Sequence, residues 1–267
     1  MWDPAQYQRY SNERSRPFFE LVSRVGATSP RYVIDLGCGS GDLTVALAER
    51  WPGAEVAGVD NSAEMLEAAQ ATLAGFRDRD RGKPGPGSLS FRRGDVAEFA
   101  PSRAPDVIVS NAVLQWVPCH RELLPRWAGM LAAGGWLAFQ VPGNFDQPSH
   151  HLLRELAGSA RWREQLAGVA VTRQTHHPGD YLELLAAAGC EVDAWETTYL
   201  HILHGDDAVL DWYKGSGLRP VIAALRPDQA AEFLDEYAAR LRAAYPARGF
   251  GTVLPFRRVF VVARRSA

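Results

Sequence analysis

The chain lacks several features that mark whole classes of protein. It has only three cysteines among 267 residues, and Cys38, Cys119 and Cys190 lie far apart, so neither a disulfide framework nor a zinc motif is indicated. No apolar run approaches the ~18 residues of a membrane span. The start, Met1–Pro4, lacks the basic segment and apolar run of a secretory leader. These absences predict a cytoplasmic protein with no membrane partner.

An excess of charge is also missing. The formal net charge is −2, from 29 basic and 31 acidic residues, whereas nucleic-acid binders usually show a basic excess or stripe. We therefore expect no nucleic-acid partner. Lysine is scarce, since Lys83 and Lys214 stand beside 27 arginines. Codon bias is the ordinary explanation, and anion recognition by the planar guanidinium group is the alternative that position must decide.

Short apolar runs alternate with helical stretches in the first half of the chain. The expected strands are 32–36, 54–59, 88–92, 106–110 and 136–141, and the expected helices are 41–51, 64–73 and 122–131. Repeated β-α units predict an α/β fold in which helices cover both faces of a parallel sheet. Residues 77–87 are charged and then rich in proline and glycine, which predicts a mobile surface loop.

The second half changes in character. We expect residues 143–178 to be irregular, a helix over 178–188 and a strand over 191–203. A mostly helical stretch then covers 206–246, with breaks at 215–217 and Pro220, before a last strand at 253–264. The predicted organisation has four parts: an N-terminal helical segment (1–29), a Rossmann-like core (30–142), cap segments with the sixth strand (143–250) and the last strand (251–267).

A glycine-rich turn, Asp35-Leu36-Gly37-Cys38-Gly39-Ser40-Gly41, follows the first expected strand. Gly37, Gly39 and Gly41 give the spacing G-x-G-x-G, whereas a dinucleotide site requires G-x-G-x-x-G. The Asp35 carboxylate would repel a pyrophosphate but attract an ammonium group. The turn therefore favours S-adenosylmethionine over NAD.

Polar residues also follow the next three strands. Asp60, with Asn61 beside it, is placed to accept both ribose hydroxyls. Asp95, with Val96, is placed to accept the adenine amine, and Asn111 ends the fourth strand. Because ligands bind at the carboxyl ends of strands in open α/β sheets, these residues are predicted to form one cofactor site with the glycine turn.

This pattern resembles the seven-stranded, Rossmann-like class I methyltransferases over roughly residues 30–142 and the two late strands. Segments along nearly the whole chain are similar to trans-aconitate methyltransferases; they are 7–17, 111–116, 188–193, 197–199, 217–220 and 256–265. The resemblance implies a sheet with a mostly helical cap. It also implies S-adenosylmethionine as cofactor, S-adenosylhomocysteine as product, and a monomethyl ester formed on a small di- or tricarboxylate. Residues 77–87 look like an insertion relative to that family.

A carboxylate acceptor is already ionised at neutral pH and needs no general base, so catalysis would rest on orientation and on the exclusion of water. We expect Gln115 and Trp116 to be the catalytic residues at the end of the fourth strand. Cationic and hydroxyl side chains are expected to bind the acid, namely Tyr7, Ser11, Arg14, Tyr199, Lys214, Arg219 and Arg257. Side chains alternate along a strand, and of Arg257 and Arg258 we expect Arg257 to face the acid.

Other functions stay open at this point. A methyltransferase acting on another oxygen, nitrogen or carbon acceptor would want a base such as His201. A non-catalytic regulator would bind the cofactor or its product without turnover. A hydride-transferring dehydrogenase is disfavoured by the glycine spacing. The pairs His150-His151 and His176-His177 lack clustered carboxylates or cysteines, so no metal is expected. We expect a monomer.

Overall fold

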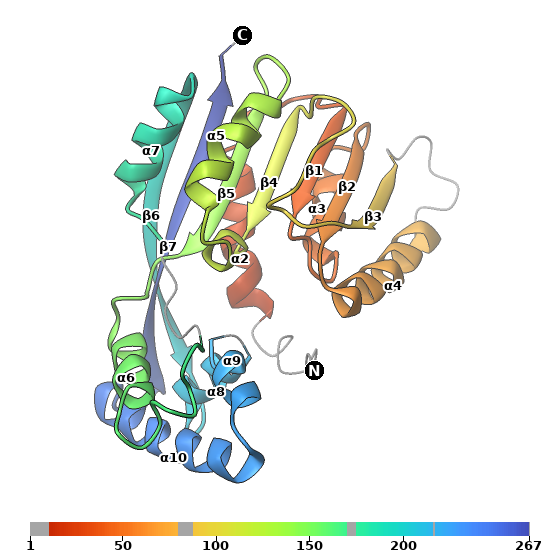
Figure 1. The fold of residues 1–267 in the computed structure, drawn as a ribbon. Helices are drawn as coiled ribbons and strands as arrows, with labels where there is room; N and C mark the ends of the chain where they lie inside the picture. Colours follow the sequence, from red (N-terminus) through yellow and green to blue (C-terminus); the bar gives the residue numbers. More distant parts are fainter. Residues whose placement is uncertain (1–10, 80–87, 170–174, 216, 267) are drawn as a thin grey trace. The chain divides into compact units, whose positions relative to one another are not determined.

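The computed structural model describes residues 11–79, 88–169, 175–215 and 217–266. Its strands form one seven-stranded sheet in the order β3-β2-β1-β4-β5-β7-β6 (Figure 1). The strands are β1 (Tyr32–Leu36), β2 (Glu55–Asp60), β3 (Leu89–Arg93), β4 (Val107–Asn111), β5 (Trp136–Pro142), β6 (Cys190–Leu203) and β7 (Thr252–Arg265). The fold class predicted from the sequence is confirmed.

The order of the strands locates the ligand-binding edge. Strands β1 to β5 are parallel, with β2 and β4 on opposite sides of β1. Strands β2 and β3 are therefore added on one side of β1, and β4 and β5 are added on the other side. In open parallel sheets such a reversal leaves a crevice at the carboxyl ends of the two strands concerned, here β1 and β4.

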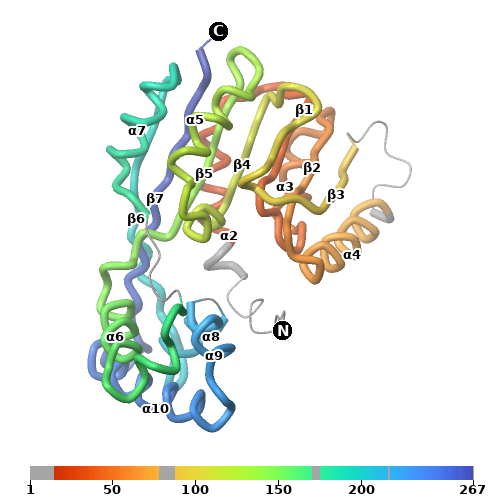
Figure 2. The backbone as a smooth tube through the Cα atoms, in the orientation of Figure 1, coloured from red at the N-terminus to blue at the C-terminus, as the bar shows by residue number. Residues whose placement is uncertain are grey.

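Helices flank the sheet as the sequence predicts. They are α2 (Ser11–Ser23), α3 (Asp42–Arg50), α4 (Ala63–Arg79), the 3-10 turn η1 (Leu114–Trp116), α5 (His120–Met130), α6 (Pro148–Ala157), α7 (Pro178–Ala187), α8 (Ala208–Lys214), α9 (Arg219–Ala224) and α10 (Pro227–Ala244). Helices α5 and α7 lie in front of the sheet, whereas α2 and α3 lie behind it (Figure 2). No helix within the described ranges is both long and apolar enough to cross a membrane.

Three local predictions are wrong. Residues 143–178 are not all irregular, since α6 begins there at Pro148, a residue suited to the first turn of a helix. Helix α4 runs to Arg79, into the expected loop 77–87, of which 80–87 lie outside the described residues. Pro220 does not break a helix, because it lies in the first turn of α9.

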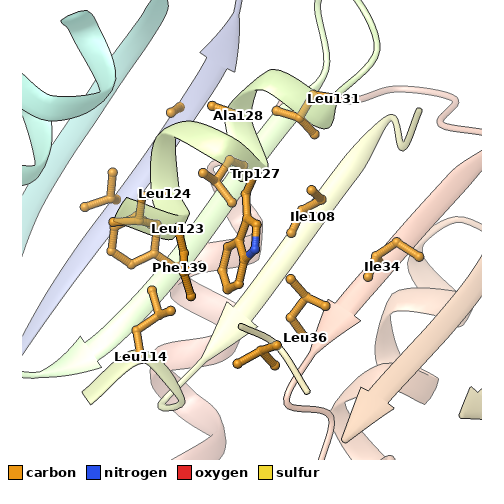
Figure 3. Close-up of a cluster of buried hydrophobic side chains, with 14 of the residues drawn as sticks. Ile34, Leu36, Ile108, Leu114, Leu123, Leu124, Trp127, Ala128, Leu131 and Phe139 are labelled. Atoms are coloured by element: carbon orange, nitrogen blue, oxygen red, sulfur yellow. The ribbon is translucent and has the colours of Figure 1, made fainter. Parts of the chain in front are cut away.

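The chain divides into two compact units, each with its own core. The sheet unit comprises Ser15–Val141, His176–Glu196 and Val259–Ala267, and the helical unit includes Pro142–Thr175 and Thr197–Arg258. In the core of the sheet unit the buried ring of Trp127 on α5 packs against the strands (Figure 3).

The core of the helical unit is aromatic. The rings of Trp162 and Phe233 meet edge to face with their centroids 5.4 Å apart. Both side chains are buried, and Tyr237 on α10 lies in the same cluster. Apolar burial of this extent explains why α6 forms although residues 143–178 were expected to be irregular.

Candidate active site

The glycine turn adopts a backbone that favours glycine. Gly37, Gly39 and Gly41 have φ angles of 81°, 55° and 82°. A Cβ on Gly37 would lie 2.1 Å from Val113 Cγ2, whereas a Cβ on Gly39 would have no neighbour within 4 Å. Gly37 is therefore required by packing against the end of β4, and Gly39 borders open space that a ligand can approach.

Asp60, the last residue of β2, ties this turn to its own strand. One carboxylate oxygen accepts the Gly39 N–H at 2.9 Å, and the other accepts the Ser62 N–H at 2.9 Å. A carboxylate has about four lone-pair positions, so Asp60 retains capacity for ligand hydroxyls. Asn61 is exposed beside it. The predicted neighbours of the nucleoside thus lie together.

Asp35 is buried within β1, with 3% of its surface exposed. Its Oδ2 accepts a hydrogen bond from Thr44 Oγ1 at 2.6 Å. Burial raises the pKa of the carboxyl to about 6, and the charge of Asp60 raises it further while the Thr44 hydrogen bond lowers it. A cation bound nearby would favour the ionised form, so this carboxyl is suited to a ligand that carries an ammonium group.

Two buried acceptors lie at the end of β4. Asn111 Oδ1 and Gln115 Oε1 accept no hydrogen bond from any residue that the structure describes. The Gln115 amide donates instead to Ala112 O at 2.6 Å, and Ala112 has a φ of 56°, which is unusual for a residue other than glycine. Buried acceptors without donors are costly, and a ligand rich in N–H groups would satisfy them.

The 3-10 turn η1 presents Trp116 to solvent. This side chain is 49% exposed, although Leu114 in the same turn is fully buried in the core of the sheet unit. The turn is therefore anchored at one residue and exposed at another. An exposed indole beside Gln115 is suited to cover a small acceptor and keep water away.

The end of β3 completes the edge. Gly94 N–H donates to Asp60 O at 3.0 Å, which ties Asp95 to the neighbourhood of Asp60. Asp95 is exposed and accepts the Ala97 N–H at 2.8 Å, whereas Val96 is buried in the core. Asp95 is thus available to a ligand amine, and Val96 contributes mainly packing.

Those residues expected to bind the acid that the structure describes lie outside the sheet unit. Tyr7 is outside the described residues, and Ser11 and Arg14 belong to α2, although their side chains are not described. Tyr199 is buried on β6, where its ring stacks on His201 with centroids 6.0 Å apart. Lys214 forms an ion pair with Asp211 at 3.1 Å, so part of its charge is already neutralised.

The adjacent arginines Arg257 and Arg258 of β7 differ as alternation predicts. Arg257 is partly exposed and its Nη1 donates to Gly143 O at 2.9 Å. Arg258 is 4% exposed, with its guanidinium 4.8 Å from the centroid of the Phe256 ring. Arg219 is partly exposed at the first position of α9. Arg219 and Arg257 both belong to the helical unit.

Sequence reasoning missed Thr44 and a buried polar cluster. Thr44 is fully buried on α3 and holds Asp35; a polar residue on the apolar face of that helix is the signal that was available. In the helical unit Tyr213 Oη lies 2.9 Å from Ser149 Oγ and accepts from Asn144 Nδ2 at 3.2 Å. Burial raises the pKa of Tyr213, so it remains a neutral hydroxyl. Across the described ranges no three His, Cys, Asp or Glu side chains gather as a metal site.

Comparison with known proteins agrees with this geometry. A family model described as a methyltransferase domain matches residues 7–194. The chain is 54% identical to the trans-aconitate 2-methyltransferase of Streptomyces coelicolor, over 99% of this chain and 86% of that protein. It is 52% identical to the trans-aconitate 2-methyltransferase of Streptomyces avermitilis, over 100% of this chain and 97% of that protein.

A solved structure shares the fold. The geranyl diphosphate C-methyltransferase of Streptomyces coelicolor, solved with S-adenosyl-L-homocysteine, aligns with a TM-score of 0.53 at 18% identity, over 94% of this chain and 79% of that one. Identity this low supports the architecture alone.

Proposed function

The chain belongs to the trans-aconitate 2-methyltransferase family, and from that premise we propose that it methylates a carboxylate of trans-aconitate or of a similar small di- or tricarboxylate. The methyl donor is S-adenosylmethionine, and the products are a monomethyl ester and S-adenosylhomocysteine. The observation that carries the proposal is the pair of buried acceptors, Asn111 Oδ1 and Gln115 Oε1, beside the glycine turn that follows Asp35 and the end of β1.

The residues present fit this donor. Asp60 would hold the ribose hydroxyls, Asp95 the adenine amine, and Asp35 with Asn111 the ammonium end. Every one of these groups is an acceptor or an anion, which suits a cationic ligand and opposes a pyrophosphate. When bound, S-adenosylmethionine supplies a methyl group on a positively charged sulfur.

The protein's part in the transfer is placement. A carboxylate oxygen of the acid would bond to the methyl carbon that the donor supplies, and the electron pair of the broken carbon–sulfur bond would remain on sulfur. No proton moves, because the acceptor is ionised at neutral pH. Arg219 and Arg257 would pair the carboxylates that do not react, since guanidinium groups bind carboxylates in a bidentate manner. Trp116 would exclude water, and alignment of this kind supplies roughly 7–11 kcal/mol.

The other acceptor chemistries have less support. A hydroxyl or amine acceptor needs a base, and His201 was the candidate. Its ring is 8% exposed and stacks on Trp212 with centroids 4.8 Å apart, within an aromatic cluster that includes Phe256. A ring enclosed in this way is poorly placed to take a proton from an acceptor.

The test is mass spectrometry of a panel of acids incubated with the protein and methyl-labelled S-adenosylmethionine. We expect one labelled methyl on trans-aconitate and a rate that is nearly flat from pH 6 to 9. A rate that climbs about tenfold per pH unit through neutrality would indicate a hydroxyl or amine acceptor. Tight cofactor binding with no labelled acid would indicate a regulator.

A further inference from the structure

His120, the first residue of α5, closes the turn that carries Gln115 and Trp116. Val117 O accepts the His120 backbone N–H at 3.1 Å and lies 2.9 Å from His120 Nδ1. The ring is 2% exposed. A single side chain therefore holds the carbonyl at which the turn ends.

One arrangement of protons pairs this ring fully with its partners. A carbonyl only accepts, so Nδ1 carries a proton. Nε2 lies 3.0 Å from Tyr181 Oη, which in turn accepts the His176 N–H at 3.2 Å. If the imidazole is neutral, Nε2 accepts a hydrogen bond from the Tyr181 hydroxyl, and every polar atom in the row from Val117 O to the His176 N–H is paired. Burial lowers the pKa of the His120 ring, in agreement with the neutral form.

Two features of the segment 112–116 destabilise its conformation, so it needs support from its surroundings. Ala112 has a φ of 56°, a left-handed conformation that disfavours alanine, and Gln115 Oε1 is buried without a donor. Both features oppose the conformation in which Gln115 and Trp116 are presented. Strain of this kind persists only where the surroundings enforce it.

We propose that His120, oriented by Tyr181, is a positioning residue for methyl transfer that keeps Gln115 and Trp116 in place through Val117 O. The proposal rests on the proposed function. Tyr181 comes from α7, and its side chain is fully buried. Tyr181 on α7 thereby holds the orientation of the His120 ring on α5, and the ring holds Val117 O at the end of the turn.

Two amide substitutions separate the two hydrogen bonds. His120→Asn places an amide N–H where Nδ1 stood and can still donate to Val117 O. His120→Gln places its amide near the position of Nε2, so it retains Tyr181 and loses Val117. We expect His120→Gln to lower kcat roughly 10–100-fold, the cost of about 1 Å of misplacement, with the Kd of S-adenosylhomocysteine nearly unchanged. His120→Asn should recover most of that loss.

Leu185→Val is the matched control, because it removes packing on α7 in the same core and leaves the His120 hydrogen bonds intact. It should lower the Tm with little change in kcat. Equal losses of kcat in His120→Asn and His120→Gln would overturn the proposal, as would an unchanged His120→Gln. If His120→Gln does not fold, Tyr181→Phe, which removes one hydroxyl, takes its place and should lower kcat severalfold.

A readout without turnover separates this inference from the proposed function. Nitrogen-15 NMR of the wild-type protein should show a His120 ring that is protonated at Nδ1 and bare at Nε2. The Trp116 indole resonance should move in His120→Gln and not in His120→Asn. These results would support the positioning role even if no acid were methylated. The opposite tautomer, or a Trp116 resonance that is the same in all variants, would overturn it.

Discussion

Alanine substitutions at Gly39 and Gly37 form a matched pair: the first should mainly weaken cofactor binding, and the second should mainly lower the stability of the fold. Gly39→Ala places a methyl group that has no neighbour within 4 Å, so its cost to folding is the left-handed φ alone, about 1–2 kcal/mol. The methyl would project into the space assigned to the cofactor. We therefore expect S-adenosylhomocysteine to bind at least about tenfold more weakly, which is about 1.4 kcal/mol.

Gly37→Ala adds a clash to the same backbone cost. Its Cβ would lie 2.1 Å from Val113 Cγ2, and overpacking in a core costs typically about 1–3 kcal/mol. The sum is roughly 2–5 kcal/mol, a large part of the ~5–15 kcal/mol that stabilises a domain. Gly37→Ala should thus lose much more stability than Gly39→Ala.

Urea unfolding without ligand and calorimetric titration with S-adenosylhomocysteine measure the two effects. A Gly39→Ala protein that binds like wild type would show that the ligand does not occupy the space above this glycine. Equal losses of stability in the two variants would refute the packing argument.

Two further predictions concern charge. Because the pKa of Asp35 is raised from 3.8 to about 6, its ionised form is lost below that pH, and affinity for the cationic donor should fall there by up to about tenfold per pH unit. Asp35→Asn should bind the donor weakly at every pH. Calorimetry from pH 5 to 8 measures both, and an affinity that rises on acidification would contradict the prediction. For folding the sign is opposite to that of a paired carboxylate, since the contribution of Asp35 to stability falls as the pH rises from about 4 to 6. Arg219→Lys and Arg257→Lys should each raise KM for the acid, at a cost of about 2–4 kcal/mol in kcat/KM, and leave the Kd of S-adenosylhomocysteine unchanged. Variants with wild-type kinetics would show that these arginines are structural.

The sheet, and the position of the candidate cofactor residues at its strand ends, were predictable because their signals are local. A central strand such as β1 is buried on both faces and reads as a continuous apolar run that stops at glycine. The acidic residue that ends β2 follows the same logic, since a ligand-binding carboxylate must come where a strand ends. These signals need only a few neighbouring residues.

The rest depends on partners far along the chain. Helix α6 was missed because its buried face is defined by α10, which follows some seventy residues later. The pairing of His120 with Tyr181 spans 61 positions, and no sequence pattern around either residue predicts it. The roles of Arg219 and Arg257 came from resemblance, because a surface arginine has no local mark that distinguishes anion binding from solvation.

The division into two units has a consequence for how such an enzyme can change. Every candidate cofactor contact falls within the uninterrupted stretch Ser15–Val141, whereas Tyr199, Arg219 and Arg257 fall within Thr197–Arg258. On the proposed assignment, the donor contacts are encoded in one part of the gene and these three acid contacts in another. A recombination that exchanges the second stretch would therefore change how the acid is held and keep the donor contacts, while Gln115 and Trp116 would stay with the donor site.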